Sequence, residues 1–196
     1  MNATTRLRFG LLGTLLAVGL GIAAQRSTIA GPPAAPKSEV KLVAVNFDGM
    51  IKDIASKKAK LTVVDAWATW CGPCKENFPH LVDMREKYAG KGIAFASLCL
   101  DDATKSKKVA EATEFLVSKK ADFSNYLLEE SQDDAFEKLD ITAIPAVFMF
   151  GPDGKEIRRF TLEDVNNQFT YDQVETAVQE FLAGKPMTTG VVYKKR

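Results

Sequence analysis

Residues 70–74 read Trp70-Cys71-Gly72-Pro73-Cys74, and this stretch decides the fold and the chemistry expected of the chain. Residues 61–66, just before it, form an apolar run rich in β-branched side chains, which predicts a buried strand. Residues 74–89, which follow, carry apolar side chains at helical spacing and predict a helix. Cys71 is therefore expected at a junction between a strand and the first turn of a helix.

Two cysteines separated by two residues can close a small disulfide across that first turn and cycle between dithiol and disulfide. The N–H groups and the dipole at the start of a helix favour negative charge, so they lower the pKa of the Cys71 thiol. Because the thiolate is the nucleophile in disulfide exchange, Cys71 is predicted to be the exposed, attacking cysteine. Cys74 lies one turn further in and is predicted to resolve the mixed disulfide, while Gly72 and Pro73 set the turn.

Two other interpretations of the cysteine pair are weighed against this one. A zinc site needs four ligands, and Cys99 and His80 are the only further Cys and His in the sequence. A purely structural disulfide would suit an exported protein. The flanking Trp70 and the order strand, motif, helix argue against both alternatives.

The N-terminus has the pattern of a targeting segment. Arg6 and Arg8 precede an uncharged apolar run over residues 9–24, which predicts a secretory signal within residues 1–30. The run is shorter than the roughly 20 residues that a membrane-spanning helix prefers, but a retained membrane anchor remains the alternative. The sequence therefore predicts a protein that acts outside the cytoplasmic membrane, in the periplasm or secreted, and released or tethered.

Length, charge and composition limit the possible partners and indicate where the folded domain begins and ends. The chain has 196 residues and a formal net charge of +1, which does not suggest a nucleic-acid partner. Three prolines within residues 31–39 predict a semi-rigid linker. A folded domain is expected over residues 40–184, followed by a tail at 185–196 that carries no clear pattern.

Strands and helices are expected to alternate through that domain, which predicts an α/β fold with a parallel core. The expected strands cover residues 41–45, 61–66, 93–100, 123–128, 145–150 and 155–160, the last two joined by a tight turn. The expected helices cover residues 48–58, 74–89, 104–119, 132–139 and 171–182.

The motif, together with Asp65 six residues before Cys71, Pro79 after it and Ile144-Pro145 further on, resembles the thioredoxin superfamily. Over about residues 40–183 the chain is similar to the exported, TlpA/ResA-like branch of thiol-disulfide oxidoreductases. The resemblance implies a thioredoxin-like three-layer fold, with a central mixed sheet flanked by helices. It also implies an insertion at about residues 101–135, between the active-site helix and the cis-proline loop, which either selects partners or is an inert elaboration.

The resemblance assigns roles to several residues. It makes Asp65 a buried proton carrier for Cys74, and the alternative is a partly exposed aspartate at a strand end. It makes the bond before Pro145 cis, which leaves the backbone of Ile144 free to pair with an extended substrate strand. Trp70 is expected on the surface beside the cysteines, and Cys99 is expected to be a buried apolar filler.

The favoured function is thiol-disulfide exchange with protein substrates, without a cofactor. By resemblance, Gly-Pro between the cysteines favours a reductant, and an exported reductant needs electrons from a membrane-embedded donor. An oxidant that forms disulfides and a non-catalytic thioredoxin-like binding or chaperone module remain the alternatives. A peroxidase is disfavoured because no Pro-x-x-x-Thr/Ser-x-x-Cys pattern leads to Cys71.

Overall fold

The computed structural model describes residues 39–162 and 168–192. Within these residues six strands form one sheet: β1 (Leu42–Val45), β2 (Leu61–Trp67), β3 (Ile93–Cys99), β4 (Ser124–Leu128), β5 (Ala146–Phe150) and β6 (Glu156–Phe160). The helices are α1 (Phe47–Ser56), α2 (Gly72–Lys87), α3 (Ser106–Ser118), α4 (Gln132–Leu139) and α5 (Tyr171–Leu182). The predicted signal or anchor at 1–30, the linker up to residue 38 and the end of the tail lie outside the described residues.

The sheet is mixed, in the order β1-β4-β3-β2-β5-β6. Strands β1, β4, β3 and β2 run parallel, β5 pairs with β2 in the antiparallel direction, and β6 pairs with β5 in the same way. All seven residues of β2 are buried, as a continuous apolar run predicts for a strand covered on both faces. The expected α/β class with a mixed central sheet is confirmed.

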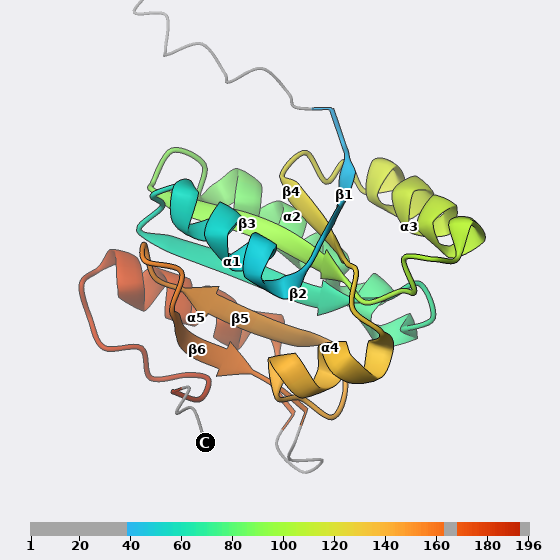
Figure 1. Cartoon of the computed structure of the whole chain (residues 1–196). Coiled ribbons are helices and arrows are strands. Elements are labelled where there is room, and N and C mark those ends of the chain that lie inside the picture. Colours follow the sequence, from blue (N-terminus) through green and yellow to red (C-terminus); the bar gives the residue numbers. More distant parts are fainter. Residues whose placement is uncertain (1–38, 163–167, 193–196) are drawn as a thin grey trace, which may run out of the picture. The chain divides into compact units, whose positions relative to one another are not determined.

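Helices cover both faces of this sheet. Figure 1 shows α1 and α4 in front of the strands, with α2 and α5 behind them. The ring of Trp67 in β2 lies 5.5 Å from that of Phe78 in α2 and 4.8 Å from that of Phe115 in α3, so α3 packs on the same side as α2. Burial of a side chain such as Phe78 contributes about 1.5–3 kcal/mol, and these rings anchor the active-site helix to the central strand.

The predicted insertion contributes one strand to the central sheet. Helix α3 and strand β4 occupy the stretch expected at 101–135, and β4 lies between β1 and β3 and pairs with both. The buried Asn125 of β4 accepts a hydrogen bond from Ser97 of β3 and donates to the backbone oxygens of Ala121 and Phe123. The insertion therefore contributes apolar and polar contacts to the core of the fold, whether or not it also selects partners.

The element boundaries differ from the predicted ones by a few residues. Helix α2 begins at Gly72 rather than at residue 74, because the side chain of Cys71 caps it and a proline fits its first turn. Helix α1 begins at Phe47 because Asn46 accepts the backbone N–H of Gly49. In the described part of the chain, no helix has both the length and the apolar character needed to cross a bilayer.

Candidate active site

The cysteine pair lies at the start of α2 and is closed as a disulfide. Cys71 is the N-cap residue, Cys74 is in the first turn, and their Cα atoms are 5.3 Å apart. The backbone N–H of Cys74 points to the Sγ of Cys71 at 3.2 Å. No acidic residue occupies the first turn of α2, so the helix end presents uncompensated N–H groups to the Cys71 sulfur. In the reduced protein, N–H groups at this position favour negative charge on the sulfur.

Cys71 is less exposed than predicted. It is 5% exposed in the disulfide form, and Cys74 is 1% exposed. Both cysteines are therefore buried, and Cys71 is slightly the more accessible of the two. The cover comes from the loop before β5, because the carbonyl oxygen of Ile144 lies 3.8 Å from the Cys71 Sγ. Sequence spacing alone did not predict this cover, since 73 residues separate the two positions.

Three of the predicted substrate-binding residues lie at the surface, whereas Ile144 and Pro145 are buried. The Ile144-Pro145 peptide bond is cis, as the resemblance implied. Trp70 is half exposed, Gly72 and Pro73 are exposed, and Trp67 is fully buried. A cavity of about 350 Å³ next to them is lined by Pro73, Asn77, His80, Pro145, Thr170 and Tyr171, among others. The exposed residues Trp70, Gly72 and Pro73 thus adjoin the disulfide, and the buried Ile144 turns its carbonyl oxygen toward Cys71.

Asp65 is buried in β2, on the sheet side that faces α5. Its side chain is 1% exposed, and its Oδ2 accepts a hydrogen bond of 2.7 Å from the Tyr171 hydroxyl. Burial raises the pKa of Asp65 to about 7, and the hydrogen bond from Tyr171 acts in the opposite direction. A carboxyl group with this pKa can take up and release protons near neutral pH. The alternative of a partly exposed aspartate at a strand end is therefore wrong.

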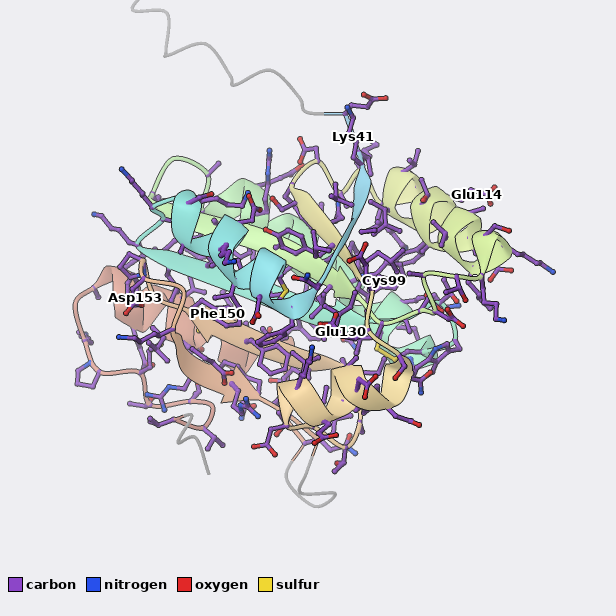
Figure 2. The ribbon with its side chains drawn as sticks, in the orientation of Figure 1. Lys41, Cys99, Glu114, Glu130, Phe150 and Asp153 are labelled. Atoms are coloured by element: carbon purple, nitrogen blue, oxygen red, sulfur yellow. A yellow bond between two sulfur atoms is a disulfide. The ribbon has the colours of Figure 1, made fainter. Side chains whose placement is uncertain are left out.

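A second buried carboxylate fixes the loop that leads to the cysteines. Asp101, 3% exposed, accepts hydrogen bonds of 2.8 Å from both the backbone N–H and the hydroxyl of Thr69. The thiol of Cys99 donates to the same carboxylate at 3.2 Å. Sequence reasoning did not identify Asp101 as part of the site, although its place directly after an apolar strand was a usable signal. In Figure 2, Cys99 is labelled in the interior of the molecule near the ends of the central strands.

The candidate zinc ligands are not gathered into one cluster. Cys99 bonds to Asp101, and the His80 ring stacks on Tyr171 with centroids 5.5 Å apart. Among the residues that the structure describes, no group of three or more Cys, His, Asp or Glu side chains is arranged to hold a metal ion.

Cys99 is predicted to be unreactive in the folded protein. Burial and the neighbouring carboxylate of Asp101 raise the pKa of its thiol, so almost no thiolate forms at neutral pH. Titration of the native, reduced protein with a thiol reagent should therefore modify about two thiols rapidly. Rapid reaction of a third thiol would contradict this, and unfolding the protein should release it as a positive control.

The mixed sheet, the disulfide at the start of α2 and the cis-proline beside it define a thioredoxin-like thiol-disulfide oxidoreductase. The family model for Redoxin matches residues 30–178, and the chain belongs to this family. Within the thioredoxin superfamily it is a TlpA/ResA-like protein, as the sequence motifs had indicated.

Curated relatives agree with this assignment, and a solved structure shares the fold. The chain is 27% identical over 145 residues to the thiol-disulfide oxidoreductase ResA of Oceanobacillus iheyensis, covering 72% of this chain and 68% of that protein. It is 23% identical over 157 residues to ResA of Bacillus subtilis, covering 79% and 83%. The thioredoxin domain of the thiol-disulfide oxidoreductase BVU-2223 from Bacteroides vulgatus shares the fold, with a TM-score of 0.53, 19% identity and coverage of 76% and 99%.

Proposed function

We propose that the protein reduces disulfides in extracytoplasmic protein substrates through the Cys71/Cys74 couple. The observation that carries this proposal is the position of Cys71 at the N-terminus of α2, bonded to Cys74 and next to the carbonyl of Ile144. That arrangement supports a stabilised Cys71 thiolate, with a second thiol within bonding distance, and we assign the backbone of Ile144 to substrate binding.

The reaction takes two steps. The Cys71 thiolate attacks one sulfur of the substrate disulfide, whose S–S bond breaks, and the other substrate sulfur leaves as a thiolate. Cys74 then loses its proton to Asp65 and attacks the Cys71 sulfur, which releases the second substrate thiolate and leaves Cys71–Cys74 oxidised. Two electrons pass to the substrate, whose thiolates take up protons from water.

Substrate binding is assigned to the surface beside the pair. An extended substrate strand would pair with the backbone of Ile144, next to Pro145, while Trp70 and the exposed Gly72-Pro73 turn contact the residues around its disulfide. Main-chain pairing gives affinity without demanding one sequence, which suits a protein with disulfide-bonded protein substrates.

The reducing direction requires a source of electrons. Outside the cytoplasmic membrane disulfides persist, so the oxidised pair would be reduced again by a membrane-embedded donor. Residues 1–30 would deliver the domain there, as a cleaved signal or a retained anchor. N-terminal sequencing of the protein from its native host separates these two forms, and full-length chain in the cytosol would contradict both.

The direction of exchange tests the proposal. The reduced protein, mixed with a peptide that contains one internal disulfide, should convert the peptide to its dithiol and become oxidised in equal amount. The oxidised protein, mixed with the dithiol form of the same peptide, should leave most of it unchanged. Efficient oxidation of the peptide would favour a disulfide-forming enzyme, and exchange in neither direction would indicate a binding module.

A further inference from the structure

Tyr171 connects α5 to the proposed proton carrier. It is the first residue of α5, its ring is 6% exposed, and its hydroxyl donates to Oδ2 of Asp65, which lies 106 residues earlier in the chain. A capping box formed by Thr170 and Gln173 fixes the start of this helix. The position of the hydroxyl is therefore set by a stable helix end and by ring packing against His80 and Phe169.

The second oxygen of Asp65 is left for another partner. Its Oδ1 is buried and accepts no hydrogen bond from the residues that the structure describes. Ser97, which lies beside Asp65 in β3, donates its hydroxyl to Asn125 instead. On the other side β5 contributes only apolar residues, with Val147 next to Asp65. Leaving a buried acceptor without a hydrogen bond costs folding free energy, so its presence here calls for an explanation.

The elements packed against Asp65 contribute few titratable groups. Of the buried residues within α2, Cys74 is the one with an ionisable group, which is bonded to Cys71 in the disulfide, and His80 reaches the site only through its stacking on Tyr171. Of the buried residues of α5, Tyr171 is the one that titrates. No charged side chain acts appreciably on Asp65, so burial and the Tyr171 hydroxyl govern its proton affinity.

We propose that Tyr171 is a positioning residue that keeps Asp65 usable as the base for Cys74, by donating a hydrogen bond to one carboxylate oxygen and leaving the other free. This inference rests on the proposed function. Without the donor, burial alone would hold the carboxyl protonated over a wider pH range. With it, Asp65 is ionised in part of the molecules at neutral pH, and its Oδ1 can accept the Cys74 proton. The hydroxyl remains protonated throughout and does not itself transfer a proton.

Tyr171→Phe tests this assignment because it removes the hydroxyl and keeps the ring. The side-chain ¹³C signal of Asp65, assigned with Asp65→Asn, is followed through a pH titration of the oxidised protein. We expect the titration midpoint to rise by about one unit in Tyr171→Phe. At pH 7 the resolving step should then be about fivefold slower, with formation of the mixed disulfide unchanged, and the deficit should disappear as pH rises through the new midpoint.

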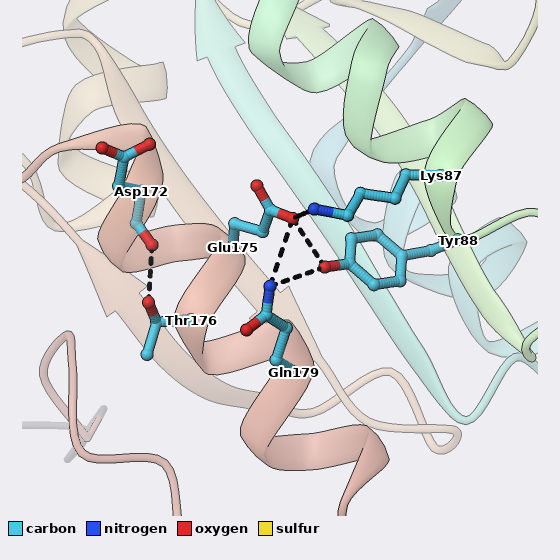
Figure 3. A network of polar contacts seen from close by, with 6 residues as sticks. All are labelled: Lys87, Tyr88, Asp172, Glu175, Thr176 and Gln179. Atoms are coloured by element: carbon cyan, nitrogen blue, oxygen red, sulfur yellow. Dashed lines mark hydrogen bonds and ion pairs between the residues drawn. The ribbon is translucent and has the colours of Figure 1, made fainter.

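Tyr88→Phe is the matched control. Tyr88 is also buried between α2 and α5, and its hydroxyl donates to the carboxylate of Glu175 at 2.7 Å. Figure 3 shows this network, in which Gln179 donates to the Tyr88 hydroxyl and Lys87 pairs with Glu175. Loss of this hydroxyl removes a tyrosine–carboxylate hydrogen bond to α5 that does not involve Asp65, so Asp65 should titrate as in the wild type.

The outcomes separate the two claims. Superimposable Asp65 titrations in wild type and Tyr171→Phe would overturn the role of Tyr171, even if the enzyme exchanges disulfides as proposed. A wild-type protein that exchanges no disulfides would overturn the proposed function. The Asp65 titration would still test whether the Tyr171 hydroxyl sets the proton affinity of Asp65. If Tyr171→Phe does not fold, replacement of the tyrosines by 3-fluorotyrosine, a stronger hydrogen-bond donor, must lower the Asp65 midpoint, and no change would refute the inference.

Discussion

Replacement of Cys71 by serine is expected to abolish disulfide reduction, with a loss of at least about three orders of magnitude in rate. Cys71 is the N-cap of α2 and receives the N–H of Cys74, so the helix end stabilises its thiolate. A serine hydroxyl at the same place does not ionise at neutral pH and cannot form a disulfide. Loss of turnover with the peptide disulfide, together with an unchanged fold by circular dichroism, would establish the assignment.

Cys74→Ser should behave differently from Cys71→Ser. The attacking thiol remains, but no second thiol can resolve the mixed disulfide, so substrate should accumulate covalently on Cys71. Mass spectrometry of the trapped species identifies the residue that carries the substrate. Cys99→Ser is the control, because Cys99 is buried and outside the couple, and it should turn over normally. Accumulation of substrate on Cys74 in Cys71→Ser would reverse the two roles.

Asp65→Asn is expected to stabilise the fold and slow the resolving step. The pKa of Asp65 is raised from 3.8 to about 7 by burial, so between these values the native state binds a proton that the unfolded state has released. The contribution of Asp65 to the stability of the wild type must therefore fall as pH rises from about 4 to 7, by up to about 4 kcal/mol. Asparagine does not ionise, so the gain should be near zero at pH 4 and reach about 2–4 kcal/mol at pH 8.

Chemical denaturation at both pH values measures this gain, and stopped-flow kinetics measure the rate of resolution. Asp53→Asn is a control of opposite sign. Asp53 also accepts a hydroxyl hydrogen bond, from Tyr126, but it is more exposed, and its hydrogen bonds with Tyr126 and Lys57 lower its pKa despite partial burial. Its replacement should therefore cost stability above pH 4. A gain in stability over the wild type that is the same at both pH values, or an attack step slowed as much as resolution, would refute the role given to Asp65.

The sequence predicted the features that depend on local pattern. The Trp-Cys-Gly-Pro-Cys motif lay between a continuous apolar run and a helical periodicity, and the structure has β2 and α2 there. The bounds of α4 and α5 also agree with the predicted 132–139 and 171–182. Cis Pro145 was predicted from the family resemblance, and no local pattern required it.

Features that depend on distant contacts could not be predicted from local sequence pattern. Strand β4 pairs with β1 and β3, and hydrophobic periodicity does not specify which strands become neighbours in a sheet. The cover over Cys71 and the Tyr171 bond to Asp65 join positions 73 and 106 residues apart. Tyr171 was predicted only as part of an amphipathic helix, because a tyrosine on an apolar face gives no sign of the partner of its hydroxyl.

The reduction potential of the Cys71/Cys74 couple tests the central claim most directly. The protein is equilibrated with dithiol–disulfide buffers of known potential, and the oxidised fraction is measured by thiol alkylation and mass. A reductant should give a value near that of thioredoxin, roughly −270 mV. A value near roughly −120 mV would mean that the couple donates its disulfide to substrates, which contradicts the proposed function.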